Sequence, residues 1–303
     1  MYWQNQIYYL RIDMAIKIAQ QVLFVSLIVI TCCYNSQAQV LRFLFTGHTY
    51  DWGVPAGNKV DSRITQLDLK KYDGFWLGGD ICANTSLDPN TWKYLEKTFN
   101  LKNPWTHIAL GNHDYRDDNL HLYNSATNKS DYYTSNIHSI VFSVINTNLN
   151  TSDCDALDEQ FEMLTTVGDT IQKASHYILL MHHQVFDKIP GLDGFKSNGI
   201  CDNYQITCNG KKRSFKERLY PKLVEMHNRG IKVLVLVGDT GWHKGGHWQS
   251  DKGIDFIASG INNSYYKSKA PEILKDIEKD KFVEFEFNVQ QKTLDWKFLN
   301  LDY

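Results

Sequence analysis

The sequence lacks the short motifs that identify several large classes of enzyme. Its 303 residues contain no G-x-S-x-G nucleophile elbow, P-loop, H-E-x-x-H zinc motif or G-x-G-x-x-G fingerprint. No C-x-x-C pair occurs either, so a cysteine metal site is not expected. Motifs therefore give no support for a serine hydrolase, a nucleoside triphosphatase, a zincin or a Rossmann dehydrogenase.

An excess of charge of either sign is also missing. Lysine and arginine number 32 and aspartate and glutamate 34, which gives a formal net charge of −2. This balance offers no electrostatic case for nucleic acid or an anionic membrane as a partner. The 43% hydrophobic and 22% charged content is ordinary for a globular protein. No repeat or Pro/Ser-rich linker divides residues 39–303, for which we predict a single domain.

The first 38 residues have the features of a secretory signal. The apolar run Val22–Thr31 is too short for a comfortable membrane span. It follows the basic residues Arg11 and Lys17 and precedes small residues that end at Ala38. We therefore predict a signal peptide over residues 1–38 and an exported protein, periplasmic or secreted, with no stable membrane span in the mature chain.

Several alternatives concern this N-terminal segment. Met14 is an alternative start that gives a more usual signal length. A lipoprotein signal would use Cys32 or Cys33, although Thr31 is a poor fit to the small residue expected before such a cysteine. An uncleaved anchor is the remaining alternative.

Four cysteines lie beyond residue 38, namely Cys82, Cys154, Cys201 and Cys208. Cysteines of an exported protein commonly form disulfides. Cys201 and Cys208 bracket a short loop and are the expected bridge.

Five apolar runs are typical of buried strands, and helix-like segments separate most of them. The runs are Val40–Thr46, Gly74–Gly78, Trp105–Leu110, His176–Met181 and Ile231–Val237. The predicted helices are Asp61–Tyr72, Thr91–Phe99, Asp155–Ala174 and Ser214–Asn228, with a hairpin over 282–299. Alternating strands and helices indicate an α/β fold, in which strand C-terminal ends gather at one edge and bind ligands there.

Each apolar run ends in a glycine or a polar cluster. The clusters are Gly47-His48, Gly79-Asp80, Gly111-Asn112-His113-Asp114, His182-His183 and Gly238-Asp239. If the strand ends converge, so do these side chains. Oxygen and imidazole donors converging in a cleft suit Zn, Mn or Fe, so we predict one or two divalent ions.

The order and content of these clusters resemble the motifs of the calcineurin-like metallophosphoesterases, including their purple acid phosphatase-like and class III phosphodiesterase-like relatives. That family's motifs run D-x-H, G-D, G-N-H-D/E, H and G-H-x-H. Gly79-Asp80 and Gly111-Asn112-His113-Asp114 match the second and third motifs, and His182-His183-Gln184 resembles the fourth. The resemblance covers roughly residues 41–260. It implies a four-layer α-β-β-α sandwich of two mixed sheets with the metal site at strand C-terminal ends.

The resemblance also implies roles for the residues. Asp80 would bridge two metals. His48 would bind the first metal, and Asn112 and His182 would bind the second. His113 would protonate the leaving group or stabilise the transition state, held by Asp114. The implied substrate is a phosphorylated small molecule, lipid or glycan, as a monoester or a diester.

Two motifs depart from the family pattern. Thr46-Gly47-His48 stands where D-x-H is expected, and Gly238-Asp239-Thr240-Gly241 stands where G-H-x-H is expected. Asp239 can replace the missing imidazole on the second metal. The first metal needs other groups, and the candidates for auxiliary metal or substrate contacts are Thr46, Asp51, His183, His243 and His247.

Two functions follow as hypotheses. The first is an exported phosphoesterase that uses metal-activated water. The second is a catalytically weakened or inactive protein of the same fold that binds a glycan or a phosphorylated ligand. For this second function, the expected rim of the cleft is Trp242, Trp248, Tyr265 and Tyr266.

Overall fold

The structure is a computed structural model that describes residues 14, 16–24, 39–115, 119–195, 197, 201, 207–208, 211–240 and 245–301. The chain forms two compact units, Met1–Gln39 and Val40–Tyr303. Residues 16–24 of the first unit are helical. No helix within the described residues combines the length and the apolar character needed to cross a membrane. The signal peptide over residues 1–38 remains a prediction.

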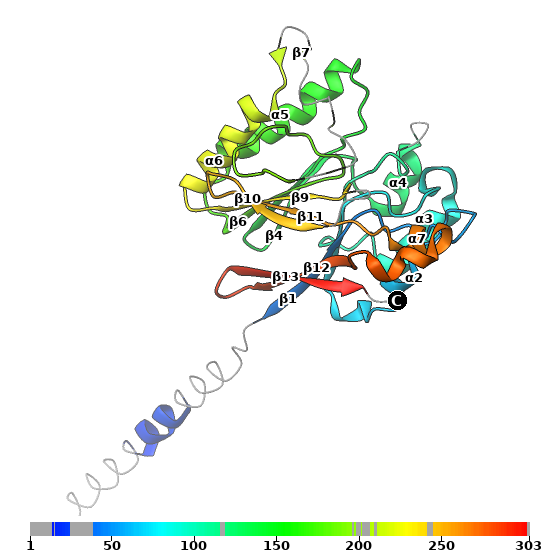
Figure 1. Cartoon of the computed structure of the whole chain (residues 1–303). Helices are drawn as coiled ribbons and strands as arrows, with labels where there is room; N and C mark the ends of the chain where they lie inside the picture. The colour runs from blue at the N-terminus through cyan, green and yellow to red at the C-terminus, as the bar shows by residue number, and fades with distance from the viewer. Residues whose placement is uncertain are drawn as a thin grey trace, which may run out of the picture. The chain divides into compact units, whose positions relative to one another are not determined.

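The second unit contains two mixed β-sheets (Figure 1). The first has the order β13-β12-β1-β2-β3, built from Thr293–Leu301, Asp280–Asn288, Val40–Thr46, Gly74–Leu77 and His107–Ile108. The second has the order β10-β11-β9-β6-β5-β4, built from Gly246–Gln249, Asp255–Ala258, Lys232–Val237, His176–Met181, Ile140–Val144 and Tyr133–Ile137. The inner neighbours β1-β2-β3 and β11-β9-β6-β5 are parallel, and the remaining pairs are antiparallel. A further small ribbon pairs β7 (Thr207–Cys208) with β8 (Lys211–Lys212).

Helices cover the outer face of each sheet. The first sheet packs against α2 (Ser62–Thr65), α3 (Pro89–Phe99) and α4 (Leu120–Thr127) in one apolar cluster. The second packs against α5 (Cys154–Thr170), α6 (Tyr220–Asn228) and the π-helix η4 (Phe215–Leu219), and Figure 1 shows α5 and α6 above it. The remaining helices are η1 (Leu69–Lys71), η2 (Thr85–Leu87), α7 (Asn263–Lys269) and η5 (Pro271–Asp276).

The alternation of side chains along the strands produces the layers. In β1, Phe43 and Phe45 point into the core between the sheets, whereas Leu44 faces the helices. In β9, Leu234 packs between the sheets and Val235 packs against α5 and α6. Each fully buried side chain of this size contributes about 1.5–3 kcal/mol of transfer free energy. The predicted α/β fold, a four-layer sandwich of two mixed sheets, is confirmed.

Some local predictions need correction. The segment Asp61–Tyr72 is not one helix, because it forms only α2 and the short turn η1. The expected strand Trp105–Leu110 pairs with β2 only at His107 and Ile108. The polar stretch taken as a loop, 117–136, contains α4 and most of β4. Pro221 marks a second helical start, since it lies in the first turn of α6 directly after the π-helix.

The predicted bridge between Cys201 and Cys208 is wrong. Cys154 is disulfide-bonded, whereas Cys82 and Cys201 are thiols. The Cys201 thiol donates to the Thr147 carbonyl oxygen at 3.1 Å. The Cys201 backbone N–H donates to the Gln184 carbonyl oxygen at 2.7 Å. These contacts hold Cys201 against the chain that follows β5 and β6.

Candidate metal centre

Three imidazole rings face one oxygen of the Asp80 carboxylate. The distance from Asp80 Oδ2 to Nε2 is 3.6 Å for His48, 3.6 Å for His182 and 4.0 Å for His113. His48 follows β1, Asp80 follows β2 and His182 follows β6, so both sheets contribute. The strand ends therefore bring together four of the residues that the sequence singled out, namely His48, Asp80, His113 and His182.

Close backbone packing makes this meeting possible. A Cβ on Gly238, which follows β9, would lie 1.8 Å from the Gly78 carbonyl oxygen. A Cβ on Gly79 would lie 2.6 Å from His182 Nδ1, and the Gly79 φ of +86° disfavours other residues as well. Glycine is therefore required where the end of β2, in the first sheet, touches the second sheet.

The backbone carries strain at two of these positions. His48 has a φ of 56° and Asp80 a φ of 53°, both in the left-handed region. Such conformations cost about 1–3 kcal/mol each for residues other than glycine and persist where the surroundings hold them. The His48 N–H donates to the Gly79 carbonyl oxygen at 2.8 Å, and the Thr49 N–H donates to the Asp80 carbonyl oxygen at 3.0 Å. Strain of this kind is frequent at functional sites.

The tautomers of two histidines follow from their partners. His182 Nδ1 lies 2.7 Å from the Gly78 carbonyl oxygen, and His113 Nδ1 lies 2.8 Å from the Ala83 carbonyl oxygen. Because a carbonyl oxygen only accepts, Nδ1 carries the proton and Nε2 of the neutral ring has a lone pair. This is the arrangement that metal-ligating histidines use.

His182 passes a direct test of fit to a metal ion. Its ring is fully buried, and its Nε2 has no hydrogen-bond partner among the described residues. A buried polar atom left in this state costs about 1–3 kcal/mol. Coordination of a cation would satisfy the lone pair, so the residues fit a divalent ion.

Asp114 does not hold His113, which corrects the role implied by the family resemblance. Its Oδ2 accepts the backbone N–H groups of Asp80 at 2.6 Å and of Gly111 at 3.0 Å. The His113 ring is held instead by the Ala83 carbonyl oxygen. Asp80 Oδ1 accepts the His113 backbone N–H at 2.9 Å. Asp114 therefore fixes the loop that carries Asp80.

Burial lowers the pKa of His48, but the pair formed by Asp80 and His182 favours positive charge. Burial opposes ionisation of Asp80, but the facing rings, led by His182 and His48, outweigh burial and lower its pKa. Burial likewise opposes the charged form of His182, but Asp80 and Asp239 outweigh it and raise the pKa of this ring. Burial, with the charge of Asp80, raises the pKa of Asp114 to about 6. A cation, whether a proton or a metal ion, is thus stabilised beside Asp80.

A second group of ligand atoms adjoins the first. Ligand atoms of His182, His183 and Asp239 all lie within 4.8 Å of one another, which makes these residues a possible metal-binding cluster. The Asp239 backbone N–H donates to the His182 carbonyl oxygen at 2.9 Å, which holds the ends of β9 and β6 together. Burial, and next the neighbouring His182, lower the pKa of His183 to about 3, so this ring is neutral and able to ligate.

Among the described residues, no hydrogen bond or ion pair links four other residues named from the sequence to this cluster, namely Asn112, Thr46, Asp51 and His247. The Asn112 side chain is exposed, and no hydrogen bond joins it to Asp80 within the part of the chain that the structure describes. The Thr46 hydroxyl is buried at the end of β1 without a partner among the described residues. Asp51 lines a separate pocket. His247 Nε2 lies 2.8 Å from the Asp255 carboxylate.

The remaining predictions concern the rim of the cleft. Trp248 is half-buried, and its ring packs against Phe195 with centroids 4.7 Å apart. His243 and Trp242 lie outside the described residues. Tyr265 is half-buried on α7 and contacts Trp52.

Sequence reasoning missed two features of the site. The carbonyl oxygens of Gly78 and Ala83 orient histidines, and no side-chain motif could reveal them. Tyr50 was also missed, although its ring centroid lies 4.7 Å from that of His48 and 5.2 Å from that of His113. The spacing of His48, Tyr50 and Trp52 at every second residue was an available signal.

Comparison with known proteins does not assign the chain to a family. No family model matches the sequence, and no curated protein matches it. One similar solved structure is described as "GAP50 the anchor in the inner membrane complex of Plasmodium". It shares 13% identity at a TM-score of 0.44, over 87% of this chain and 90% of that chain. A likeness of this size carries no functional argument.

Proposed function

We propose that this chain is a metal-dependent phosphoester hydrolase. One observation carries the proposal, namely the buried Asp80 Oδ2 that faces Nε2 of His48, His182 and His113. The adjoining His182, His183 and Asp239 extend the donor set. Imidazole and carboxylate donors in this number suit Zn, Mn or Fe.

The donor set bears on the number of ions. Asp80 faces both His48 and His182, and His183 and Asp239 form a further group with His182. Because His182 has only one available ring nitrogen, it serves one ion at a time. The five groups therefore suffice for one well-ligated ion, or for two ions that share Asp80 and have few protein ligands each.

The protein groups divide the remaining work. A divalent ion held there would supply Lewis-acid stabilisation of phosphate oxygens and would acidify a water molecule. His113 is suited to proton transfer because its Nδ1 is held by Ala83 and its Nε2 points toward Asp80. The His113 side chain is 20% exposed, whereas that of His182 is fully buried. His113 is therefore the ring that a leaving-group oxygen can reach.

Export is part of this proposal. The signal-like segment over residues 1–38 supports it. The disulfide at Cys154 supports it independently, because such bonds persist mainly in oxidising compartments. The expected location is the periplasm or the cell exterior.

A second function is favoured by two specific observations. Asn112 is exposed, and Thr46 stands where the family resemblance implies a carboxylate. A weakened metal centre would leave a protein that binds a phosphorylated ligand or a glycan without cleaving it.

Metal analysis and turnover separate the two functions. The mature chain, residues 39–303, is analysed for bound metal and then assayed with phosphomonoesters and phosphodiesters after loading with Mn, Zn or Fe. Hydrolysis that a chelator abolishes and metal restores supports the enzyme, and His113→Ala is expected to lower kcat roughly 10²–10⁴-fold. Metal-loaded protein that turns over no ester contradicts it.

A further inference from the structure

A row of aromatic rings runs outward from the candidate metal centre. The Tyr50 ring contacts both His48 and His113. The Trp52 centroid lies 4.7 Å from that of Tyr50, and the Tyr265 centroid lies 5.1 Å from that of Trp52. Tyr50 is buried, whereas Trp52 and Tyr265 are half-buried. The row thus connects the histidines with α7.

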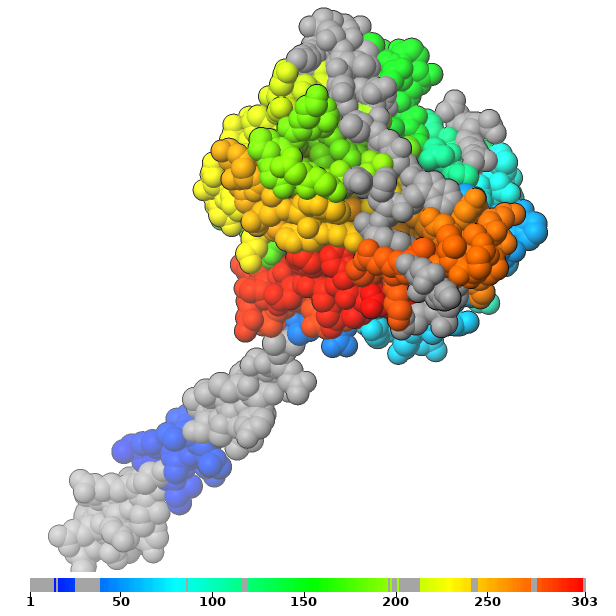
Figure 2. Space-filling view, in the orientation of Figure 1, coloured from blue at the N-terminus to red at the C-terminus, as the bar shows by residue number. Residues whose placement is uncertain are grey.

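The chain neighbours of Trp52 and Tyr265 line a polar pocket of about 350 Å³. It lies between the segment after β1, the start of α2 and the helix α7, which is orange in Figures 1 and 2. The lining residues are Asp51, Gly53, Val54, Asp61, Ser62, Ser264, Lys267 and Ser268. Trp52 is flanked by Asp51 and Gly53, and its backbone N–H donates to the Ser264 hydroxyl oxygen at 3.4 Å. The pocket and the aromatic row therefore share the same two segments.

The polar groups of this pocket offer both donors and acceptors. Asp51 Oδ1 accepts the Gly53 N–H at 2.8 Å, which fixes the carboxylate and leaves the second oxygen as an acceptor. Asp61 is already engaged, because Arg63 binds its carboxylate at 2.7 Å. Lys267 donates only, and serine hydroxyls such as that of Ser264 donate and accept.

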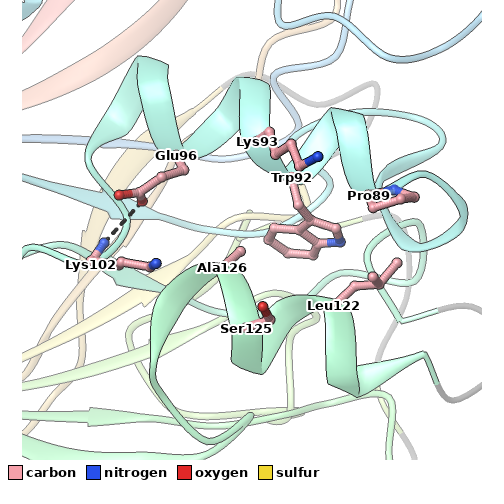
Figure 3. A pocket seen from close by; sticks show the side chains of 8 residues that line it. All are labelled: Pro89, Trp92, Lys93, Glu96, Lys102, Leu122, Ser125 and Ala126. Atoms are coloured by element: carbon pink, nitrogen blue, oxygen red, sulfur yellow. Dashed lines mark hydrogen bonds between the residues drawn. The ribbon is translucent and has the colours of Figure 1, made fainter.

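The lining excludes several kinds of ligand. A bare cation would meet Lys267, and a simple anion would meet Asp51. An apolar group would leave the carboxylate, ammonium and hydroxyl groups of the lining without ligand partners. By contrast, the cavity of about 270 Å³ between α3 and α4 has an apolar wall of Trp92, Leu122 and Ala126 (Figure 3). A neutral ligand with several hydroxyl groups matches the mixture of donors and acceptors in the polar pocket.

We propose that this pocket binds a hydroxylated ring, a sugar or cyclic polyol, and that the substrates of the candidate metal centre are phosphate esters of such rings. The statement about substrates rests on the proposed function, whereas binding of the ring alone does not. The volume lies at the small end of ligand sites, which suits a single ring. The rings of Tyr265, Trp52 and Tyr50 form a continuous series of contacts from α7 to His113.

Binding of the unphosphorylated ring is the first test. Glucose, mannose, N-acetylglucosamine and myo-inositol are titrated into the mature protein by calorimetry and by saturation-transfer NMR. Asp51→Asn preserves the size of the side chain and an oxygen for the Gly53 N–H, and is expected to weaken binding about 10- to 100-fold. Asp295→Asn, the same change at an exposed position on β13, is the matched control. Lys267→Gln, at an exposed position on α7, serves if Asp51→Asn fails to fold.

Substrate preference is the second test. The ratio of kcat/KM for sugar phosphates to that for 4-nitrophenyl phosphate is expected to fall about 10- to 100-fold in Asp51→Asn and to stay unchanged in Asp295→Asn. Binding of no ring by the wild type, or equal effects of the two substitutions, overturns the inference. Hydrolysis with an unaltered ratio contradicts the inference alone. Ring binding without any hydrolysis contradicts the proposed function and leaves the ring site in place.

Discussion

His182 and His48 stand at equal distances from Asp80 Oδ2 but are held in different ways. The His182 ring is fixed by the Gly78 carbonyl oxygen, which leaves Nε2 as the buried, unsatisfied atom. The His48 ring has its buried Nδ1 without a partner among the described residues and packs against Tyr50. The His182 ring has a fixed tautomer, whereas the His48 ring is oriented by packing and by a strained backbone.

The surroundings of the two rings differ in the same way. At the ends of β6 and the neighbouring β9, here called the β6 side, His183 and Asp239 add further donors to a ring already set for coordination. On the β1 side, Thr46 supplies only a hydroxyl where the family resemblance implies a carboxylate. Ligands held in place lose less conformational freedom on binding, so the β6 side is expected to dominate metal affinity.

A third buried histidine has a structural role and serves as a comparison for the two that face Asp80. His107, in β3, is also fully buried, but Tyr133 and Ser135 hydroxyls lie 3.0 and 3.4 Å from its two ring nitrogens. Its ring stacks on Phe142 with centroids 4.3 Å apart. Burial alone therefore does not mark a ligand, and an unsatisfied nitrogen beside a carboxylate is the stronger sign.

Asp80→Asn should have the largest effect, because both sides of the cluster depend on this carboxylate. Loss of the charge removes the counter-ion of the bound cation, and the several kcal/mol that metal ions give to the transition state correspond to roughly 10³-fold or more in kcat/KM. Metal content by atomic emission should fall together with activity. Asp255→Asn, the same change beside His247, is the control. Retention of full metal content by Asp80→Asn would contradict the assignment.

The comparison of His182 with His48 predicts unequal effects of the same substitution. His182→Ala should weaken metal binding at least about 100-fold, and His48→Ala about 10-fold, since even loss of an outer-shell partner costs about 10- to 100-fold. Competition with a chelating dye gives both values. His121→Ala, at an exposed position on α4, controls for the loss of an imidazole. Equal losses at the two positions would show that ring fixation does not determine affinity here.

The fold was largely predictable because it depends on periodicity. Runs such as Val40–Thr46 and Ile231–Val237 combine β-branched or aromatic residues with clear ends, and both are strands at or near those bounds. Segment 105–110 was predicted as a full strand because its residues are apolar. Only two of these residues pair with β2. Pairing depends on the partner strand, which local pattern does not contain.

The candidate site was predictable only in part, for a different reason. Asp80, His113 and His182 could be named because side chains after strand ends converge. The tautomers could not, because they depend on the carbonyl groups of Gly78 and Ala83. The predicted role of Asp114 was wrong for the same reason, since its carboxylate accepts hydrogen bonds from backbone N–H groups and not from His113. Backbone partners are a property of the folded chain.

The pH dependence of the free energy of unfolding should reveal the structural role of His107. Burial lowers its pKa to about 3, so between this value and the ordinary pKa the unfolded chain binds a proton that the folded chain does not. Its contribution to stability is therefore complete above about pH 6.5 and declines as the pH falls, by about 2 kcal/mol between pH 7 and pH 5. The difference in the free energy of unfolding between pH 7 and pH 5, measured with denaturant, should be smaller by about 2 kcal/mol in His107→Gln than in the wild type.

Thr46→Asp tests the β1 side directly and should have the smallest effect. The new carboxylate would lie at the end of β1, beside His48, and would join Asp80 in attracting a cation. We expect metal to bind the β1 side about 10-fold more tightly, the value of one added favourable interaction of about 1.4 kcal/mol. Without metal, the buried charge should lower the free energy of unfolding by about 1–3 kcal/mol, so metal should stabilise the variant more than the wild type. Thr46→Asn has a similar shape without the charge and separates volume from electrostatics. If both variants bind metal as the wild type does, the β1 side is not limited by its missing carboxylate, and the looser hold on the His48 ring is the difference that matters.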